Sequence, residues 1–289
     1  MVMLEINEEI IRLVDQAIEE DLDGGIDVTS VATIPNLLES EAKFIAKADG
    51  VIAGVRVAEL VMKRCGVRGF QFHRNDGDIV RHGDLIATAS GDTRSILLAE
   101  RTALNFLCHL SGIASLTARW VNAVAGTKAK IRDTRKTTPG LRTLEKYAVL
   151  VGGGVSHRFS LSDQALIKDN HIAASGSLTG AFLALRKEFP DIDVEVEVEN
   201  LEQLREALGC GVATIMLDNM DIEMTKQAVA ITAGRAKLES SGGLSLESAF
   251  TYAKTGGDFL AVGALTHSAP ALDISLDISN HNSPLKGSK

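Results

Sequence analysis

The sequence is poor in aromatic residues and in cysteine. Phe, Tyr and Trp make up only 4% of the 289 residues, so a core must be built mainly from Ala, Val, Leu and Ile. The three cysteines, Cys65, Cys108 and Cys210, lie far apart and include no CxxC pair. An odd, scattered set argues against a disulfide framework or a thiolate zinc site, and is typical of a reducing compartment.

Long apolar runs and an overall positive charge are also missing. No run approaches the roughly 18 apolar residues of a membrane span. Residues 1–30 are acidic, whereas a secretory signal begins with basic residues. The net charge of −8 opposes nonspecific binding to nucleic acid and to anionic membranes. We therefore expect a cytoplasmic protein that acts on small molecules, with no nucleic-acid or membrane partner.

Basic residues gather in one section of this acidic chain. From Lys130 to His171 there are eight Lys or Arg and two His, against four Asp or Glu. They are interleaved with glycines and apolar positions instead of forming one polar face of a regular helix. A cationic section in an acidic protein concentrates anions at one place, although a solvated basic surface is the alternative. We predict a site for a small, multiply anionic substrate.

The first half of the chain changes character along its length. Residues 5–21 have the apolar periodicity of an amphipathic helix, and residues 95–125 that of a long helix. Between them, residues 40–95 combine short alternating runs with Gly-Asp turns, which predicts a small β-rich domain. Lys47 lies near one of these turns, where a carrier protein would hold a modified lysine. A non-enzymatic carrier is therefore one alternative.

The second half repeats a strand, a polar strand end and a helix. Residues 192–198 alternate strictly, with Val on one face and Glu on the other, and Asn200 with Gln203 is placed as a capping box for the helix that follows. Further strands are predicted at 129–132, 165–167, 213–217, 236–238 and 259–262. Glu197, Asp218 and Glu239 recur at intervals of 21 residues. This repeat predicts a (β/α) barrel with its polar strand ends on one rim.

The polar strand ends suggest chemistry. Arg135 and Lys136 precede a Pro-Gly turn, and Arg offers a planar fork for carboxylates while Lys offers a point charge for phosphates. Lys168 at the end of a strand is either salt-bridged inside the barrel or catalytic. Glu197 and Asp218 are candidate Mg²⁺ ligands or acceptors for sugar hydroxyls. The alternative is that such acids pair with interior lysines, which we expect for Glu195 and Glu199.

Two glycine-rich turns are candidate phosphate sites. Residues 240–243 and 262–264 follow the last two predicted strands and have backbone amides free to hold a phosphate. Each turn is a weak signal alone, but the last two loops of a barrel are a frequent phosphate site.

Three basic motifs resemble the quinolinate phosphoribosyltransferase family. They are residues 132–142 (RDTRKTTPGLR), 152–158 (GGGVSHR) and 166–171 (LIKDNH). Residues 195–199, 217–219, 239–243 and 262–267 match in the same order, so the resemblance covers nearly the whole chain. Ser156 stands where the family is expected to have Asn.

The resemblance implies an α/β fold with an N-terminal α/β open-sandwich domain, residues 1–105, and an irregular (β/α) barrel, residues 106–269. Residues 270–289 are expected to pack with the first domain. It also implies phosphoribosyl transfer from phosphoribosyl pyrophosphate to quinolinate with decarboxylation, which gives nicotinate mononucleotide, with Mg²⁺ as cofactor. A homodimer is implied, in which one subunit supplies Arg101 to the other, and higher oligomers are left open.

The same resemblance implies the roles of individual residues. Those expected to bind quinolinate are Arg101, Thr134, Arg135, Lys136, His157, Arg158 and Lys168. Those expected to bind phosphoribosyl pyrophosphate are Lys136, Lys168, Glu197, Asp218, Ser241, Gly242, Gly243, Val262, Gly263, Ala264 and His267. Glu197 and Asp218 are the candidate ligands of Mg²⁺.

Two other classes of protein remain as alternative interpretations of the sequence. A related barrel associated with molybdenum-transport operons shares part of the motif set, although the intact run 166–171 disfavours it. A Schiff-base aldolase would use Lys168 at a strand end, but Glu197 and Asp218 would have no evident task in it.

Overall fold

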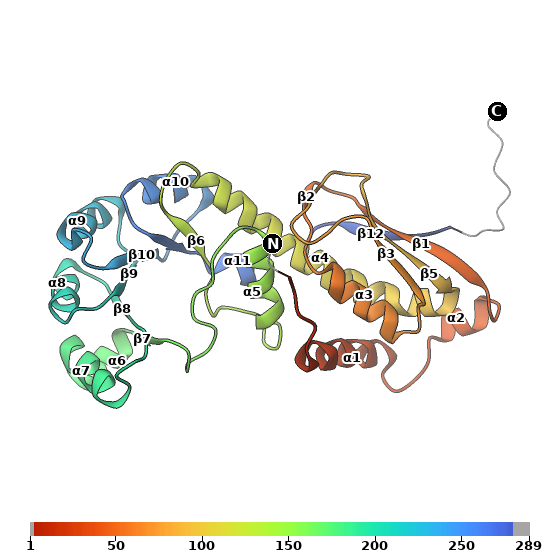
Figure 1. The fold of residues 1–289 in the computed structure, drawn as a ribbon, viewed down its shortest axis with the longest axis horizontal. Helices are drawn as coiled ribbons and strands as arrows, with labels where there is room; N and C mark the ends of the chain where they lie inside the picture. The colour runs from red at the N-terminus through yellow and green to blue at the C-terminus, as the bar shows by residue number, and fades with distance from the viewer. Residues whose placement is uncertain (1–2, 280–289) are drawn as a thin grey trace. The chain divides into compact units, whose positions relative to one another are not determined.

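The computed structural model describes residues 3–279, which form two compact units (Figure 1). One unit contains residues up to Leu116, Thr143–Gly152 and the chain from Ala269 on. The other contains Thr117–Arg142 and Gly153–Ser268. The boundary predicted between residues 105 and 106 lies inside helix α4 (Thr93–Ala123), which continues into the second unit.

The first unit is built on a four-stranded antiparallel sheet in the order β12-β1-β5-β3. Its strands are β1 (Glu39–Ala46), β3 (Gly69–Phe72), β5 (Leu85–Asp92) and β12 (Ile274–Ser279), and a small pair is formed by β2 (Gly50–Val51) and β4 (Ile79–Val80). Its helices are α1 (Glu8–Leu22), α2 (Val28–Thr33), α3 (Val55–Arg64) and α5 (Arg142–Val151), with most of α4. Of residues 270–289, which were expected to pack with this domain, 274–279 form the edge strand β12 of a sheet otherwise made by the N-terminal section, and 280–289 lie outside the described residues.

The core of this unit is apolar. Alternate residues of β1, namely Ala42, Phe44 and Ala46, are fully buried. Helix α1 begins at Glu8 because the Asn7 side chain accepts a hydrogen bond from Ile10 N at 3.0 Å. The predicted β-rich section contains β1 to β5, but it also contains α3, whose apolar residues the sequence analysis did not separate from the neighbouring strands.

The second unit is built on a six-stranded parallel sheet in the order β6-β11-β10-β9-β8-β7. Its strands are β6 (Lys130–Arg132), β7 (Ala165–Ile167), β8 (Val194–Val198), β9 (Thr214–Asp218), β10 (Lys237–Ser241) and β11 (Phe259–Ala261). Its helices are α6 (Asp169–Ser175), α7 (Leu178–Glu188), α8 (Leu201–Gly209), α9 (Ile222–Thr232), α10 (Leu246–Lys254) and α11 (Ala264–His267). Within residues 3–279 the edge strands β6 and β7 do not pair, so the barrel is irregular and open, and the α/β prediction is confirmed.

The two faces of β8 differ as the alternation predicts. Val194, Val196 and Val198 are buried in an apolar cluster with residues of the surrounding helices, and Figure 1 shows α8 and α9 on the outer side of the strands. Glu195 and Glu197 occupy the opposite face. Helix α8 is capped by Asn200, but Gln203 Oε1 accepts from Glu199 N (2.8 Å), so the predicted reciprocal capping box was wrong in this detail.

Among the described residues, none of the helices combines the length and the apolar composition that crossing a bilayer requires.

Candidate active site

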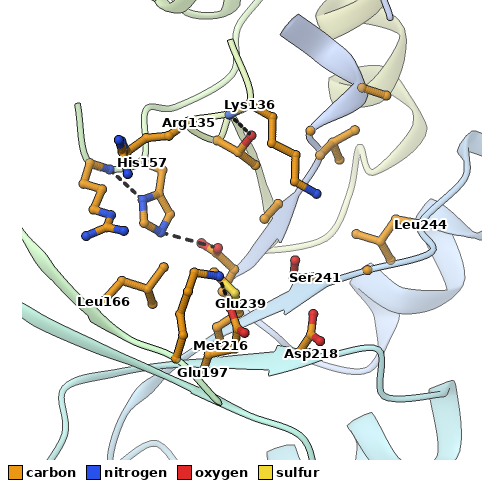
Figure 2. Close-up of a pocket in the computed structure, with 18 of the residues that line it drawn as sticks. Arg135, Lys136, His157, Leu166, Glu197, Met216, Asp218, Glu239, Ser241 and Leu244 are labelled. Carbon is orange, nitrogen blue, oxygen red and sulfur yellow. Dashed lines mark hydrogen bonds and ion pairs between the residues drawn. The ribbon is translucent and has the colours of Figure 1, made fainter. Parts of the chain in front are cut away.

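A cavity of about 620 Å³ opens at the carboxyl ends of the parallel strands, where barrel sites are usually found. It lies entirely within the second unit. Four cationic and three acidic side chains line it, and Figure 2 shows Arg135, Lys136 and His157 across the cavity from Glu197 and Asp218. Its lining residues are Thr134, Arg135, Lys136, His157, Arg158, Leu166, Lys168, Glu197, Met216, Asp218, Glu239, Ser241, Gly242, Gly243, Leu244, Ala261, Val262, Gly263, Ala264 and His267.

The loop after β6 supplies the first cationic pair. Thr134 Oγ1 accepts a hydrogen bond from Lys136 N (3.0 Å), and Thr266 Oγ1 donates to Lys136 O (2.8 Å), so the backbone of Lys136 is held on both sides. The Arg135 Nε atom is buried and has no hydrogen-bond partner within residues 3–279. A buried guanidinium N–H without a partner is costly, which indicates that an anionic ligand completes this site.

The segment from Gly153 to Arg158 supplies the second pair. Val155 forms a parallel bridge with Arg132, and the Asp133 carboxylate accepts from His157 N at 2.8 Å. Arg158 Nη1 donates to Gln164 O (3.1 Å). Burial, and secondly the nearby Arg135 guanidinium, lower the pKa of Arg158. Two guanidiniums that disfavour each other's charge in a half-buried place are suited to sharing an anion.

The opposite wall carries carboxylates at two neighbouring strand ends. Lys168 Nζ donates to Glu197 Oε2 at 2.6 Å, so of the two alternatives for Lys168 the structure shows the salt-bridged state. Asp218 Oδ2 accepts from Asn219 Nδ2 at 2.8 Å. Both acids offer oxygen atoms, the ligands that Mg²⁺ prefers. The carboxylate oxygens at this wall therefore fit a hard divalent cation such as Mg²⁺.

Two glycines shape the end of the cavity near β10 and β11. Gly242 has φ +86°, and a Cβ there would lie 2.1 Å from Asn219 Oδ1. A Cβ on Gly263 would lie 3.0 Å from Lys136 Cδ and 3.2 Å from His267 Nε2. Glycine therefore allows the backbone of each turn to approach the side chains around it. These turns follow the last two strands, as the sequence analysis expected for a phosphate site.

Beneath the cavity lies a layer of buried charged groups. Arg132 Nη1 is 2.7 Å from Glu239 Oε2 and 3.7 Å from Glu195 Oε2, while His157 Nε2 is 2.8 Å from Glu195 Oε2. Both glutamates are fully buried. Burial, and secondly the Glu195 carboxylate, raise the pKa of Glu239 to about 8.

This layer corrects one prediction. Glu195 does not pair with an interior lysine; it faces Arg132 and His157. The reason is that the bridge between Arg132 and Val155 sets the segment of His157 beside β6, so that Arg132 and His157 both lie on the inner face of the sheet. Glu199 lies exposed beyond the end of β8.

The cavity brings together every residue predicted for the site except Arg101. Arg101 lies exposed on α4 in the other unit. The prediction missed the lining residues Leu166, Met216, Glu239, Leu244 and Ala261. Apart from Leu244, each comes two residues before a predicted one. Since strand side chains alternate, extending each predicted strand end inward by two positions would have found them.

The fold and the cavity define an open-barrel α/β protein with a cationic pocket for small anionic molecules. The model of the family "Quinolinate phosphoribosyl transferase, C-terminal domain" matches residues 113–277, and the N-terminal domain model matches residues 27–111. The chain belongs to the quinolinate phosphoribosyltransferase family. The alternatives drawn from the sequence, a molybdenum-operon relative, an aldolase and a carrier, are not favoured.

Individual relatives agree with this assignment. The nicotinate-nucleotide pyrophosphorylase [carboxylating] of Mycobacterium leprae is 52% identical over 269 residues, which cover 91% of this chain and 95% of the relative. The probable enzyme of the same name from Bacillus subtilis is 40% identical, with 94% of each chain covered. The crystal structure of NadC from Streptococcus pyogenes has a TM-score of 0.91 and 41% identity, covering 96% of this chain and 99% of that one.

Proposed function

We propose that the protein transfers the phosphoribosyl group of phosphoribosyl pyrophosphate to quinolinate. The products are nicotinate mononucleotide, pyrophosphate and CO₂, as in the de novo synthesis of NAD. The observation that carries this proposal is one cavity in which four cations face two carboxylates at strand ends, in a chain of this family. A dicarboxylate and a phosphorylated sugar require that division of charge.

Quinolinate carries two carboxylates on adjacent carbons of a pyridine ring. The guanidiniums of Arg135 and Arg158 are suited to bind them. The buried Arg135 Nε, which has no hydrogen-bond partner among the described residues, can donate to one of these carboxylates. His157 and Thr134 lie in the same part of the lining, and Lys136 and Lys168 complete the charge. The apolar side chains Leu166 and Met216 provide a surface for the ring.

Phosphoribosyl pyrophosphate is assigned to the rest of the cavity. Glu197 and Asp218 would accept hydrogen bonds from the ribose hydroxyls, and Lys136 and Lys168 would neutralise the pyrophosphate. The backbone amides of the two glycine turns would hold the 5′-phosphate. The residues assigned to this phosphate subsite are Ser241, Gly242, Gly243, Val262, Gly263, Ala264 and His267.

Mg²⁺ is assigned to Glu197 and Asp218, whose carboxylate oxygens fit a hard divalent cation. When bound, it would neutralise charge on the departing pyrophosphate. Glu197 already pairs with Lys168 at 2.6 Å, so binding of substrate and cation requires this pair to exchange partners. Lys168 would then turn to the substrate anions and Glu197 to the sugar and the cation.

The chemistry follows from this arrangement of charges. The pyridine nitrogen forms a bond to C1 of the ribose as the bond from C1 to the pyrophosphate oxygen breaks, and pyrophosphate takes the electron pair. Lys136 and Lys168 stabilise the charge that develops on the leaving group. The pyridinium ring then accepts the electron pair of the adjacent carbon–carboxylate bond, CO₂ leaves, and a proton takes its place. The cations therefore hold together two anions that would otherwise repel each other.

A homodimer is part of the proposal, because Arg101 lies on α4 outside the unit that contains the cavity. In the proposed dimer, Arg101 of one subunit would bind the quinolinate held by the other. Mixing Arg101→Ala subunits with Arg135→Ala subunits should restore activity, since some hybrid sites have both arginines. The proposal places this dimer in the cytoplasm, as the composition suggests.

The function is tested with the purified protein, quinolinate, phosphoribosyl pyrophosphate and Mg²⁺. Formation of nicotinate mononucleotide with one CO₂ and one pyrophosphate per turnover is expected, and nicotinate in place of quinolinate should give no product. Nicotinate lacks the 2-carboxylate, so it is the matched control. Turnover of nicotinate alone, or no turnover by folded protein, would overturn the proposal.

A further inference from the structure

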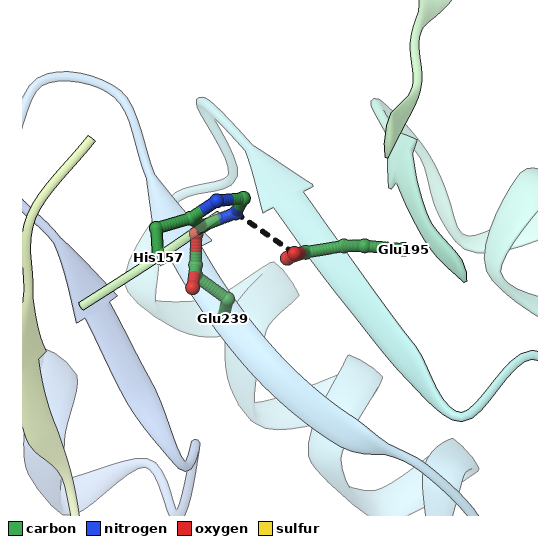
Figure 3. A group of neighbouring side chains, drawn as sticks. All are labelled: His157, Glu195 and Glu239. Atoms are coloured by element: carbon green, nitrogen blue, oxygen red, sulfur yellow. Dashed lines mark ion pairs between the residues drawn. The ribbon is translucent and has the colours of Figure 1, made fainter. Parts of the chain in front are cut away.

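The buried layer beneath the cavity has a feature that the proposed reaction does not use. His157 is only 7% exposed, and Figure 3 shows its ring beside Glu195 and Glu239. Its Nδ1 accepts a hydrogen bond from the backbone N–H of Arg158 at 2.7 Å. Its Nε2 lies 2.8 Å from Glu195 Oε2 and 3.7 Å from Glu239 Oε1.

These contacts assign the proton of the ring. Because Nδ1 accepts from Arg158 N, it has no hydrogen, and the hydrogen of a neutral imidazole must then be on Nε2, the nitrogen that lies 2.8 Å from Glu195 Oε2. His157 is therefore held as the Nε2–H tautomer. With both ring nitrogens turned to groups of the protein, His157 is assigned no direct bond to a substrate carboxylate, which differs from the role that the sequence analysis expected for it.

The same three side chains have the donor types of a metal site, with ligand atoms within 4.8 Å of one another. Metal binding by Nε2 would need its lone pair, so the ring proton would have to move to Nδ1, where it would oppose the Arg158 N–H. In addition, the Arg132 guanidinium already lies 2.7 Å from Glu239 Oε2. The geometry thus favours Glu195 and Glu239 as residues that hold the His157 ring in place, and not as metal ligands.

The charged groups around Glu239 explain which acid keeps its charge. Arg132 and Asp133 come from β6 and the residue after it, Glu195 from β8 and His157 from the segment beside β6. Arg132 faces three buried acids, Glu195, Glu239 and Asp133, so a proton retained by one of them reduces the excess of negative charge. Glu239, whose pKa is raised by burial and by Glu195, is the group that retains it. Glu195 is the acid that lies nearest to the His157 ring, at 2.8 Å.

We propose that Glu195 is a positioning residue for the quinolinate subsite. Its carboxylate fixes the ring of His157, the ring fixes the backbone of Arg158, and the same negative charge offsets the repulsion between Arg158 and Arg135. The Glu195 charge favours the charged form of Arg158, in opposition to Arg135. The identity of the substrate in this inference rests on the proposed function, but the state of the ring does not.

The kinetic test compares glutamates that differ in burial. Glu195→Gln should raise the KM for quinolinate about tenfold, while the KM for phosphoribosyl pyrophosphate and kcat change less than about twofold. Glu239→Gln should have a smaller effect, because the amide has the shape of the uncharged acid. Glu199→Gln is the matched control: it makes the same substitution at an exposed position on the same strand end, and no kinetic constant should change.

Equal rises in both KM values, or an unchanged KM for quinolinate, would overturn the positioning role. A second measurement does not depend on activity or on the folding of a variant. The ¹⁵N chemical shifts of His157 in the wild-type protein, assigned by comparison with His157→Gln, should be those of a neutral ring with Nε2 protonated at pH 7. Protonation of Nδ1 would overturn the inference even if quinolinate were confirmed as the substrate. The expected tautomer would support the inference even if the substrate were another anion.

Discussion

The two faces of the parallel sheet show how one strand pattern serves both stability and binding. On the outer face, valines of β8 pack with helix residues such as Leu204, which is fully buried. On the inner face, β8 carries Glu195 and Glu197, and the neighbouring strands add further polar groups. Alternation along the strand separates the two tasks. Substitutions on the outer face should therefore change stability, and those on the inner face should change binding.

The largest effect is expected on the outer face. Leu204→Ala should lower the free energy of unfolding by about 2–5 kcal/mol, because it leaves a cavity in a packed cluster. The kinetic constants of the protein that stays folded should hardly change. Urea denaturation and steady-state kinetics measure the two. Leu183→Ala, at a position 60% exposed on α7, is the control and should lose at most about 0.5 kcal/mol.

On the inner face, Arg135→Ala should raise the KM for quinolinate about 100-fold with little change in melting temperature. The reason is that Arg135 Nε is buried, has no hydrogen-bond partner in the part of the chain that the structure describes, and is assigned to a substrate carboxylate. Arg205→Ala, at an exposed position on α8, is the matched control. If a folded Arg135→Ala protein had unchanged KM and kcat, the assignment of this subsite would be wrong.

A third substitution separates backbone strain from damage to the site. Gly242→Ala and Gly234→Ala both place a Cβ at a positive φ, of 86° and 76° respectively. Each should cost about 1 kcal/mol in stability. Only at Gly242 does the added Cβ meet Asn219, which holds Asp218. Gly242→Ala should therefore raise the KM for phosphoribosyl pyrophosphate about tenfold, and equal kinetics for the two variants would contradict this role of the turn.

The last comparison concerns the pH dependence of stability, where the effect is spread over several pH units. The pKa of Glu239 is raised from 4.5 to about 8 in the folded protein. The folded state thus keeps a proton that the unfolded state releases above about pH 4.5. Its contribution to stability is complete below that pH and is lost as the pH rises to about 8, with a slope of at most about 1.4 kcal/mol per pH unit.

Glu239→Gln removes this titration. Between pH 5 and 8, the unfolding free energy of the wild type should fall relative to that of Glu239→Gln, as measured by urea denaturation at several pH values. Parallel curves for the two proteins would show that Glu239 keeps no proton in the folded state.

The sequence predicted the parts of the fold that depend on local pattern. The alternation at residues 192–198 and the 21-residue spacing of Glu197, Asp218 and Glu239 located β8, β9 and β10 and the rim on which their ends meet. Helix α3 was missed, because short apolar runs in a β-rich section do not by themselves distinguish helix from strand. The strand predicted at 236–238 extends to Ser241, since ladder pairing with β9 continues through its polar residues.

The lining of the cavity could be predicted where one motif carries its own chemistry, as with Arg135 and Lys136. The partners of Glu195 were not predicted. Pairing inside the barrel depends on which strands lie next to one another, and the order β6-β11-β10-β9-β8-β7 is set only when the whole sheet assembles. The sequence shows that an interior glutamate needs a cation, but the fold decides that Arg132 and His157 face it.

The most direct test of the central claim is a crystal structure of the protein with quinolinate. The account predicts quinolinate in the cavity after β6, its two carboxylates within hydrogen-bond distance of the Arg135 and Arg158 guanidiniums, and Arg101 of the partner subunit beside them. Quinolinate bound elsewhere, or bound in this cavity without contact to either Arg135 or Arg158, would contradict the account.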